Sequence, residues 1–180
     1  MEWLSQIDGN ILLFIQEYLR ADWMTPIWKF ITSLGNVGWF WIALTIILLI
    51  PKKTRKIGVA SALALAIGTL ITNVALKNIV ARTRPYEVVE GLTLLVGKAH
   101  DFSFPSGHSC ASFASAFVIF KMVPGKYGIS ALVLASLIAF SRLYVGIHYP
   151  TDVIAGIVIG ILSALISLYI IKKYEDKKNK

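Results

Sequence analysis

Five apolar stretches, separated by basic or polar segments, constrain the fold of this chain more than any other feature. Only 16% of its residues are charged and 56% are hydrophobic, whereas about 25% of residues are charged in an average soluble domain. An apolar helix of about 20 residues is long enough to cross a bilayer. The sequence therefore predicts an all-α protein, a polytopic transmembrane helix bundle with about five spans: Val37–Ile50, Ile57–Val80, Ser106–Met122, Ile129–Val145 and Val153–Ile171.

The N-terminal segment, residues 1–34, has a different pattern. Glu17, Arg20 and Asp22 interrupt its apolar residues, and a dense aromatic group follows. Such a pattern is typical of amphipathic helices at the membrane interface, although a short or tilted first span is the alternative. We expect one membrane domain, residues 1–180, with interfacial helices at 1–34, a transmembrane core at 36–172 and a basic cytoplasmic tail at 173–180.

The net charge of +8 is distributed as a topology signal rather than as a nucleic-acid-binding surface. Cytoplasmic segments of membrane proteins are rich in Lys and Arg, and three basic clusters flank the predicted spans. The alternation of spans brings all three to one side, which predicts a multi-pass protein of the plasma or inner membrane with a cytoplasmic C-terminus. The clusters are Lys52, Lys53, Arg55 and Lys56; Lys121 and Lys126; and Lys172, Lys173, Lys177, Lys178 and Lys180.

The same topology collects three polar stretches on the opposite, outer face. They are Lys77–Pro85, Phe104–His108 and Ser141–Asp152. Charged groups next to apolar spans are costly, so a chain that keeps them there is expected to use them. Together the three stretches predict a pocket for an oxyanion.

Each residue type in these stretches suits a phosphoryl group. Arg84 and Arg142 offer bidentate forks and Lys77 a point charge. Ser106 and the backbone amide of Gly107 stand where a helix begins, which favours an anion. Two histidines, His108 and His148, are available as nucleophile and acid, and Asp152 follows His148 by four positions, within reach of its imidazole.

Each stretch also has a purely structural interpretation. Arg84 could be an interfacial anchor, Ser106 only a helix start, and Asp152 only a cap of the last span. The coincidence of all three on one face favours the catalytic interpretation. No cluster at zinc-ligand spacing accompanies His100, His108 and His148, so we expect no metal and no cofactor. The short apolar island Leu92–Val96 is interpreted as a segment that dips into lipid beside the substrate's chain.

The three motifs resemble the type-2 phosphatidic acid phosphatase superfamily of integral-membrane lipid phosphatases, whose pocket is shared with vanadium haloperoxidases. The family pattern is Lys, six residues, Arg-Pro; then Pro-Ser-Gly-His; then Ser-Arg, five residues, His, three residues, Asp. Lys77 and Arg84-Pro85, Pro105–His108, and Ser141-Arg142 with His148 and Asp152 match it at every spacing.

The resemblance implies a role for each matched residue. His148 would form a phosphohistidine, Asp152 would orient it, and His108 would act as acid and then as base. The phosphoryl oxygens would be bound by Lys77, Arg84, Ser106, Gly107 and Arg142. The implied partners are a lipid phosphate and the bilayer, with undecaprenyl pyrophosphate, phosphatidylglycerophosphate, phosphatidic acid and lipid A phosphates as candidate substrates. Two other functions stay open: a phosphotransferase with an acceptor other than water, and a non-catalytic lipid-binding or transport protein. The sequence predicts no oligomeric state.

Overall fold

The structure is a computed structural model that describes residues 2–123 and 125–178. Within these ranges every regular element is a helix, which confirms the predicted all-α class. Pro124, at the predicted end of the third span, and the last two residues of the predicted tail lie outside the described residues, as does Met1. The elements are α1 (Glu2–Phe14), η1 (Ile15–Leu19), α2 (Thr25–Ser33), η2 (Asn36–Gly38), α3 (Trp39–Leu49), α4 (Arg55–Thr69), η3 (Leu70–Leu76), α5 (Lys77–Val80), α6 (Pro85–Val88), α7 (Gly107–Met122), α8 (Lys126–Tyr144) and α9 (Pro150–Lys178).

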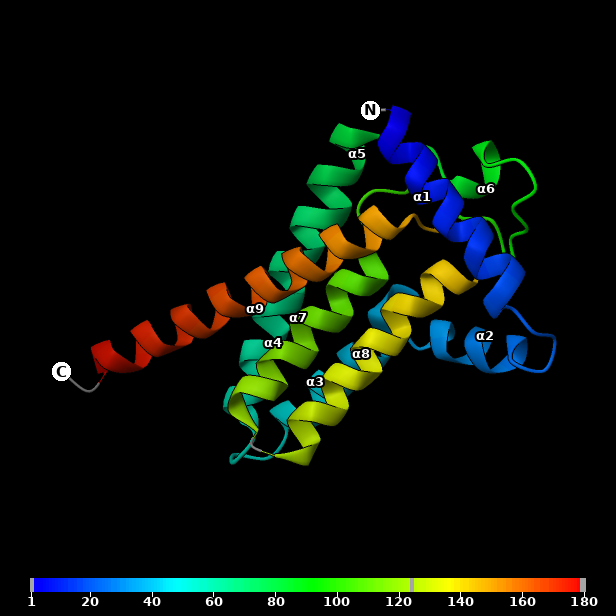
Figure 1. Cartoon of the computed structure of the whole chain (residues 1–180). Helices are drawn as coiled ribbons and strands as arrows, with labels where there is room; N and C mark the ends of the chain where they lie inside the picture. Colours follow the sequence, from blue (N-terminus) through cyan, green and yellow to red (C-terminus); the bar gives the residue numbers. More distant parts are fainter. Residues whose placement is uncertain (1, 124, 179–180) are drawn as a thin grey trace.

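Helix α7 forms the centre of the bundle and packs against α4, α8 and α9 (Figure 1). Two glycines of α9 permit the closest of these contacts. A Cβ atom at Gly156 would lie 2.5 Å from the carbonyl oxygen of Ser106, and one at Gly160 would lie 2.5 Å from that of Cys110. Small residues allow backbones to approach in this way in lipid, where helices gain nothing from excluding apolar surface.

Buried hydroxyl groups join the helices across the core. Thr45 on α3 and Ser61 on α4 share a hydrogen bond of 2.7 Å, and Ser61 shares another of 2.8 Å with Ser115 on α7. The indole of Trp41 donates to Ser112 on α7 at 2.9 Å. These bonds satisfy polar groups that would otherwise be buried without partners. They therefore fix the rotation of α3 and α4 about their axes relative to α7.

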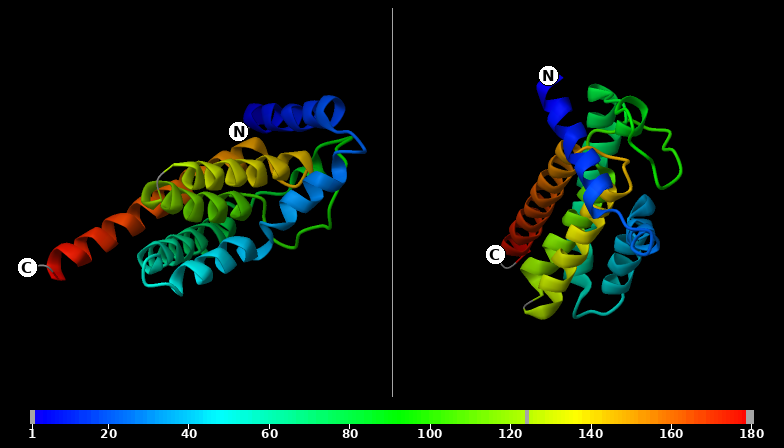
Figure 2. Two further views of the ribbon diagram at one scale, coloured as in Figure 1. Left: turned by 90° about the horizontal axis from the view of Figure 1, so that it is seen from below. Right: turned by 45° about the vertical axis from the view of Figure 1, so that its right-hand side comes forward.

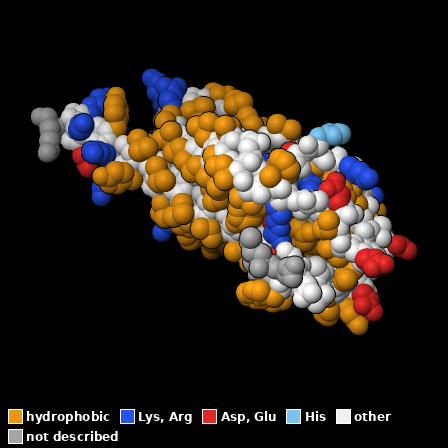
Figure 3. Space-filling model, turned by 90° about the horizontal axis from the view of Figure 1, so that it is seen from above, with side chains coloured by type: hydrophobic (Ala, Val, Ile, Leu, Met, Phe, Trp, Pro, Cys, Tyr) orange, Lys and Arg blue, Asp and Glu red, His pale blue; other side chains and the backbone are white. Residues whose placement is uncertain are grey.

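Three helical segments are long and apolar enough to cross a membrane: Arg55–Val88, Lys126–Tyr144 and Pro150–Lys178. A fourth is obtained if Thr25–Ser33 and Asn36–Leu49, which meet at a bend of 45°, form one broken span. Apolar side chains dominate the middle of the face in Figure 3, and charged side chains gather toward its two ends. The third predicted span corresponds to α7, which has 16 residues and is not among these segments. The exact number of spans stays a prediction.

The two ends of the bundle differ in the segments that they carry (Figures 1 and 2). The α3–α4 turn, the α7–α8 turn and the C-terminal end of α9 lie at one end, and these segments hold the described members of the three basic clusters. The opposite end holds α1, α6, the start of α7 and the α8–α9 connection. All three predicted polar stretches therefore meet at this second end.

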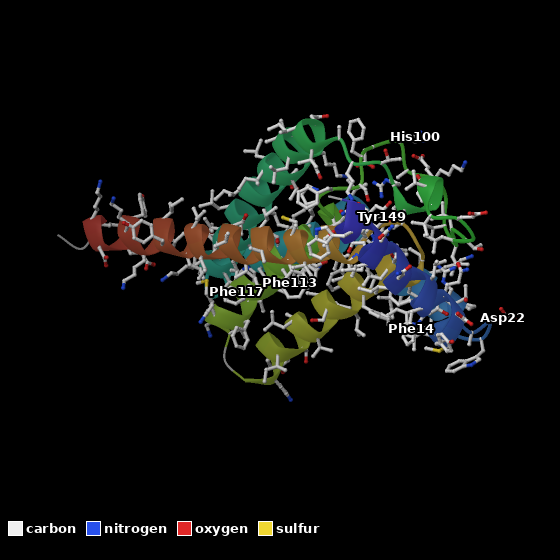
Figure 4. The ribbon with its side chains drawn as sticks, turned by 45° about the horizontal axis from the view of Figure 1, so that its top comes forward. Phe14, Asp22, His100, Phe113, Phe117 and Tyr149 are labelled. Atoms are coloured by element: carbon white, nitrogen blue, oxygen red, sulfur yellow. The ribbon has the colours of Figure 1, made fainter. Side chains whose placement is uncertain are left out.

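The N-terminal segment forms helices, and α1 lies across the end of the bundle (Figure 2). One face of α1 and η1 buries Asp8, Leu12 and Ile15, while large apolar side chains such as Ile11 and Phe14 stay exposed. In Figure 4, Phe14 points away from the bundle. An apolar outer face suits the predicted interfacial position of this segment, which stays a prediction.

The lipid-facing interpretation of Leu92–Val96 is wrong. Leu92 is buried with Leu12 and Tyr149, and the Leu94, Leu95 and Val96 side chains pack around Tyr144, Val145 and Ile147. The amide of Leu95 also donates to the carbonyl oxygen of Val145 at 3.1 Å. The island is apolar because it covers the α8–α9 connection, on which His148 stands.

Candidate active site

Six of the eight predicted site residues line one cavity of about 540 Å³. They come from all three polar stretches: Lys77, Arg84, Gly107, His108, Arg142 and His148. The other two, Ser106 and Asp152, are fully buried directly behind it. The structure thus brings together residues that are up to 75 positions apart in the chain.

Departures from regular helix place the first stretch. The π-helical segment η3 precedes Lys77, and such segments are frequent at functional sites. Helix α5 then ends at Ala81, whose left-handed conformation (φ 47°) turns the chain out of the helix. Arg84 is extended and directly precedes α6. Both cations are buried, with Lys77 7% and Arg84 4% exposed.

His148 lies in the α8–α9 connection with its two ring nitrogens in different surroundings. Nδ1 lies 3.5 Å from an oxygen of Asp152 and 3.5 Å from the hydroxyl of Ser103. Nε2 lies 3.4 Å from Nη1 of Arg84, on the cavity side. We assign the ring proton to Nδ1, directed at Asp152, which leaves the lone pair of Nε2 on the cavity side next to Nη1 of Arg84.

The carboxylate of Asp152 is held by several donors. It accepts hydrogen bonds from Arg82 Nη1 at 2.7 Å, from the Ser103 hydroxyl at 2.5 Å and from the Tyr149 amide at 3.0 Å. The bond from Tyr149 caps the start of α9, and Pro150 occupies the first helical position. The capping interpretation and the orienting role thus coexist at Asp152.

Arg82 connects this carboxylate to the N-terminal helix. Its Nη2 lies 2.7 Å from Asp8, which is 1% exposed, and its guanidinium stacks over the ring of Tyr149 at 3.8 Å. Asp8 also accepts from the amide of Thr151 at 3.2 Å and from its hydroxyl. One guanidinium therefore compensates two buried carboxylates.

His108 lines the same cavity from the start of α7. Its Nε2 lies 3.0 Å from the side-chain oxygen of Asn36. Gly35 allows this close approach, since a Cβ there would lie 2.4 Å from Cδ2 of the His108 ring. His108 also lines a second cavity of about 510 Å³, so it lies between two spaces.

The guanidinium of Arg142 is buried and only partly paired. Nη1 donates to the hydroxyl of Thr32 at 2.7 Å, whereas Nε is buried without a hydrogen-bond partner in the described part of the chain. A buried N–H without a partner costs free energy, and an oxyanion in the cavity would supply one. Gly107 lines the cavity beside Asn73, whose side-chain oxygen would lie 3.0 Å from a Cβ built at Gly107.

Ser106 is placed differently from the other oxyanion-binding candidates. Its hydroxyl accepts from the amide of Ser109 at 3.4 Å and lies 3.0 Å from the Ser109 hydroxyl, so it caps α7. It is fully buried and does not line the cavity. A direct bond from Ser106 to a phosphoryl oxygen stays a prediction that this arrangement does not support.

Sequence reasoning missed Asp101, whose carboxylate lines the same cavity. It is 2.5 Å from Nη2 of Arg84 and pairs also with Lys77. Partial burial acts to raise the pKa of Asp101, but the ion pairs with Lys77 and Arg84 outweigh it and lower that pKa below its usual value. Asp101 and Ser103 lie within three residues of the predicted stretch Phe104–His108 in the sequence. This closeness is the signal that could have identified them as site residues. Thr32, Asn36 and Asp8 carried no such signal, because they lie far in the sequence from all three polar stretches.

The donors around the cavity do not resemble a metal site. Within residues 2–123 and 125–178, no group of three or more His, Cys, Asp or Glu side chains is arranged to hold a metal ion. His100 is exposed at the periphery of the loop (Figure 4). Three cationic side chains line the cavity itself, which favours an anion.

Known proteins are similar to this chain in sequence and in fold. A family model described as PAP2 superfamily matches residues 56–176. An undecaprenyl-diphosphatase of Sulfolobus acidocaldarius is 34% identical over 178 residues, which cover 96% of this chain and 85% of that protein. This chain therefore belongs to the PAP2 superfamily, and the predicted resemblance is confirmed.

Two crystal structures extend the match to three dimensions. LpxE of Aquifex aeolicus is 28% identical with a TM-score of 0.79, covering 89% of this chain and 93% of LpxE. A transmembrane PAP2-type phosphatidylglycerolphosphate phosphatase of Bacillus subtilis is also 28% identical, with a TM-score of 0.69 over 98% of this chain and 86% of that one. The helical architecture is thus that of PAP2 membrane phosphatases.

The burial of His148 predicts a pH-dependent stability. Burial, chiefly, and the nearby Arg142 and Arg84 lower the pKa of His148 from 6.5 to about 4, although Asp152 acts in the opposite direction. The unfolded chain therefore takes up this proton at higher pH than the folded chain. The stability contributed by neutral His148 is present above about pH 6.5 and is lost as pH falls toward about 4; its scale is on the order of 3 kcal/mol.

Melting temperatures in detergent between pH 4 and 7.5 measure this effect. We expect the wild-type melting temperature to fall with pH across this window, and His148→Asn to show a smaller fall. His100→Asn, a change at an exposed histidine, should keep the wild-type slope. Equal slopes for wild type and His148→Asn would show that His148 does not titrate as its burial requires.

Proposed function

We propose that this protein is a metal-independent membrane lipid phosphatase that works through a phosphohistidine at His148. One observation carries the proposal: the free nitrogen of a buried imidazole faces a cavity lined by three cations, while its other nitrogen lies against Asp152. Recognition of a phosphate needs the cations alone. An oriented imidazole among them is what a nucleophile requires.

In the first step, Nε2 of His148 attacks phosphorus and the bond to the lipid oxygen breaks. Lys77, Arg84, Arg142 and the backbone at Gly107 stabilise the charge on the phosphoryl oxygens. His108 gives a proton to the departing oxygen. Asp152 keeps the proton on Nδ1 and stabilises the positive charge that the ring acquires.

In the second step, His108 takes a proton from water and the water oxygen attacks phosphorus. The P–N bond breaks, inorganic phosphate is formed and neutral His148 is restored. The balance needs no further reactant. Metal independence is supported by the donor set, since Lys77, Arg84 and Arg142 already supply the positive charge that a metal would bring.

The membrane position proposed for this chemistry follows the charge distribution. The basic clusters lie at the end of the bundle opposite the cavity, which supports a cytoplasmic C-terminus and an active site at the outer face of the plasma or inner membrane. The bonds of Asp8 to Arg82 and Thr151 tie α1 to the core. They support residues 1–180 as one domain that includes the N-terminal segment.

A second cavity supports a diphosphate as substrate. It shares His108 and Arg142 with the first cavity and is lined also by Lys29, Thr32 and Asn36. When the reacting phosphorus lies against His148, the leaving group departs toward His108. A second phosphoryl group there would meet the ammonium of Lys29 and the guanidinium of Arg142. The uncharged leaving group of phosphatidic acid would gain nothing from Lys29, so this cavity favours a polyprenyl diphosphate over phosphatidic acid.

Replacing Lys29 tests the substrate class. In Lys29→Gln we expect kcat/KM for a prenyl diphosphate to fall about tenfold, the scale of one charge-assisted contact, and kcat/KM for phosphatidic acid to stay within about twofold. Lys98→Gln, a charge change in an exposed loop residue that lines neither cavity, is the matched control. A parallel loss on both substrates in Lys29→Gln would contradict a second phosphoryl site.

The activity itself is tested by phosphate release from purified protein in detergent. We expect release from lipid phosphates to continue with excess chelator, to be inhibited by vanadate and to be lost at least about a thousandfold in His148→Ala. Loss of release with chelator would refute metal independence. Transfer to added alcohols in place of release would indicate a phosphotransferase. Function retained in His148→Ala but lost in Arg142→Ala would indicate a binding or transport protein.

A further inference from the structure

Every N–H direction of Arg84 that the proposed function needs is already occupied within the protein. Nε donates to the Asp101 carbonyl oxygen at 2.9 Å. Nη1 donates to the Ile147 carbonyl oxygen at 2.9 Å and lies 3.4 Å from Nε2 of His148. Nη2 lies 3.2 Å from the Phe102 carbonyl oxygen and 2.5 Å from the Asp101 carboxylate. A phosphoryl oxygen therefore reaches this fork only if one partner leaves.

The Asp101 carboxylate is the partner able to leave. Its side chain is 52% exposed, whereas those of Arg84 and Lys77 are 4% and 9% exposed. It belongs to a half-exposed loop side chain, whereas the other partners of Arg84 are backbone carbonyl oxygens and the buried imidazole of His148. The ammonium of Lys77 also pairs with this carboxylate. One exposed carboxylate thus covers both buried cations from the solvent side.

A carboxylate and a phosphoryl group make the same demands on such donors. The carboxylate is planar and the phosphoryl group is tetrahedral, but both carry anionic oxygens that accept charge-assisted hydrogen bonds from Arg and Lys. We propose that Asp101 occupies the phosphoryl-binding position in the free enzyme and is displaced when substrate binds. This inference rests on the proposed function of the same cavity, and it adds a competitor for the phosphoryl group that the three motifs do not contain.

The backbone around Asp101 allows this displacement without unfolding the loop. The carbonyl oxygen of Asp101 holds Nε of Arg84, and the amide of Ser103 donates to the carbonyl oxygen of Arg82 at 2.8 Å. These bonds keep the chain in place while the Asp101 side chain turns outward. The cations stay where they are, and only their anionic partner is exchanged.

The exchange also serves product release. Three cationic side chains, those of Lys77, Arg84 and Arg142, line the cavity, and a phosphate ion bound among them would leave slowly. The return of the Asp101 carboxylate lowers the net positive charge and supplies a replacement partner as phosphate departs. The cost is weaker binding of substrate, because substrate competes with the same carboxylate.

The test measures binding of inorganic phosphate to the purified full chain in detergent by titration calorimetry. We expect Asp101→Asn and Asp101→Ala each to bind phosphate about tenfold more tightly than wild type, the scale of a partly exposed charge-assisted contact. Asp101→Glu, which keeps the charge, should remain within about threefold of wild type. Glu90→Gln, which removes a charge from an exposed residue of the same loop that does not line the cavity, is the matched control and should bind as wild type does.

Unchanged or weaker phosphate binding in both Asp101→Asn and Asp101→Ala, with melting temperatures near that of wild type, would overturn the inference and make Asp101 a positioning residue for Arg84. If one variant fails to fold, the other and product inhibition by phosphate in steady-state assays decide the question. Phosphate binding tests the role of Asp101, and phosphate release from lipids tests the proposed function, so the two can fail independently. A wild-type protein that shows the predicted binding pattern but releases no phosphate from lipids contradicts the proposed function and leaves the role of Asp101 intact.

Discussion

Asp152 carries a buried negative charge, and three separate segments of the chain supply donors to it. Arg82, Ser103 and the amide of Tyr149 each lie within hydrogen-bonding distance. A carboxylate with no exposed surface is tolerated only when it is paired and hydrogen-bonded. Once these donors fix the carboxylate, the Nδ1 side of His148 is fixed with it, and Nε2 is left toward the cavity. The orientation of the proposed nucleophile is thus a consequence of how one buried charge is compensated.

The same compensation draws the N-terminal helix into the site. Arg82 is shared between Asp152 and Asp8, so α1 contributes to the electrostatics behind His148 although the family model begins at residue 56. Thr32 and Asn36 extend this contribution to Arg142 and His108. The core from α4 to α9 carries the motifs, and the segment before it supplies their partners. An apolar outer face on α1 suits a helix that does this work at the edge of a membrane.

The motifs were predictable because their spacing is a local property. Asp152 follows His148 by four positions. Lys77 and Arg84 lie on either side of the point where the chain leaves a helix. Neither proximity needed tertiary information. The positive-inside pattern then placed the three stretches at one end, and the structure agrees. Leu92–Val96 was misinterpreted because apolar composition does not distinguish a lipid contact from a contact with the α8–α9 connection. Asp8 and Asp101 were missed because the sequence does not show which cation each carboxylate will pair with. Tertiary folding brings Arg82 to Asp8, and Lys77 and Arg84 to Asp101.

The central claim is that phosphorus becomes bonded to His148. The most direct test uses His108→Ala and an aryl phosphate whose leaving group departs without an acid, so that the first step proceeds and the second, which needs a base, is slowed. Rapid quenching at alkaline pH followed by mass spectrometry of the peptides should find one phosphoryl group on His148, formed in amounts that approach the enzyme concentration. Turnover with no phosphoryl group on His148, or with the group on another residue, would contradict the account.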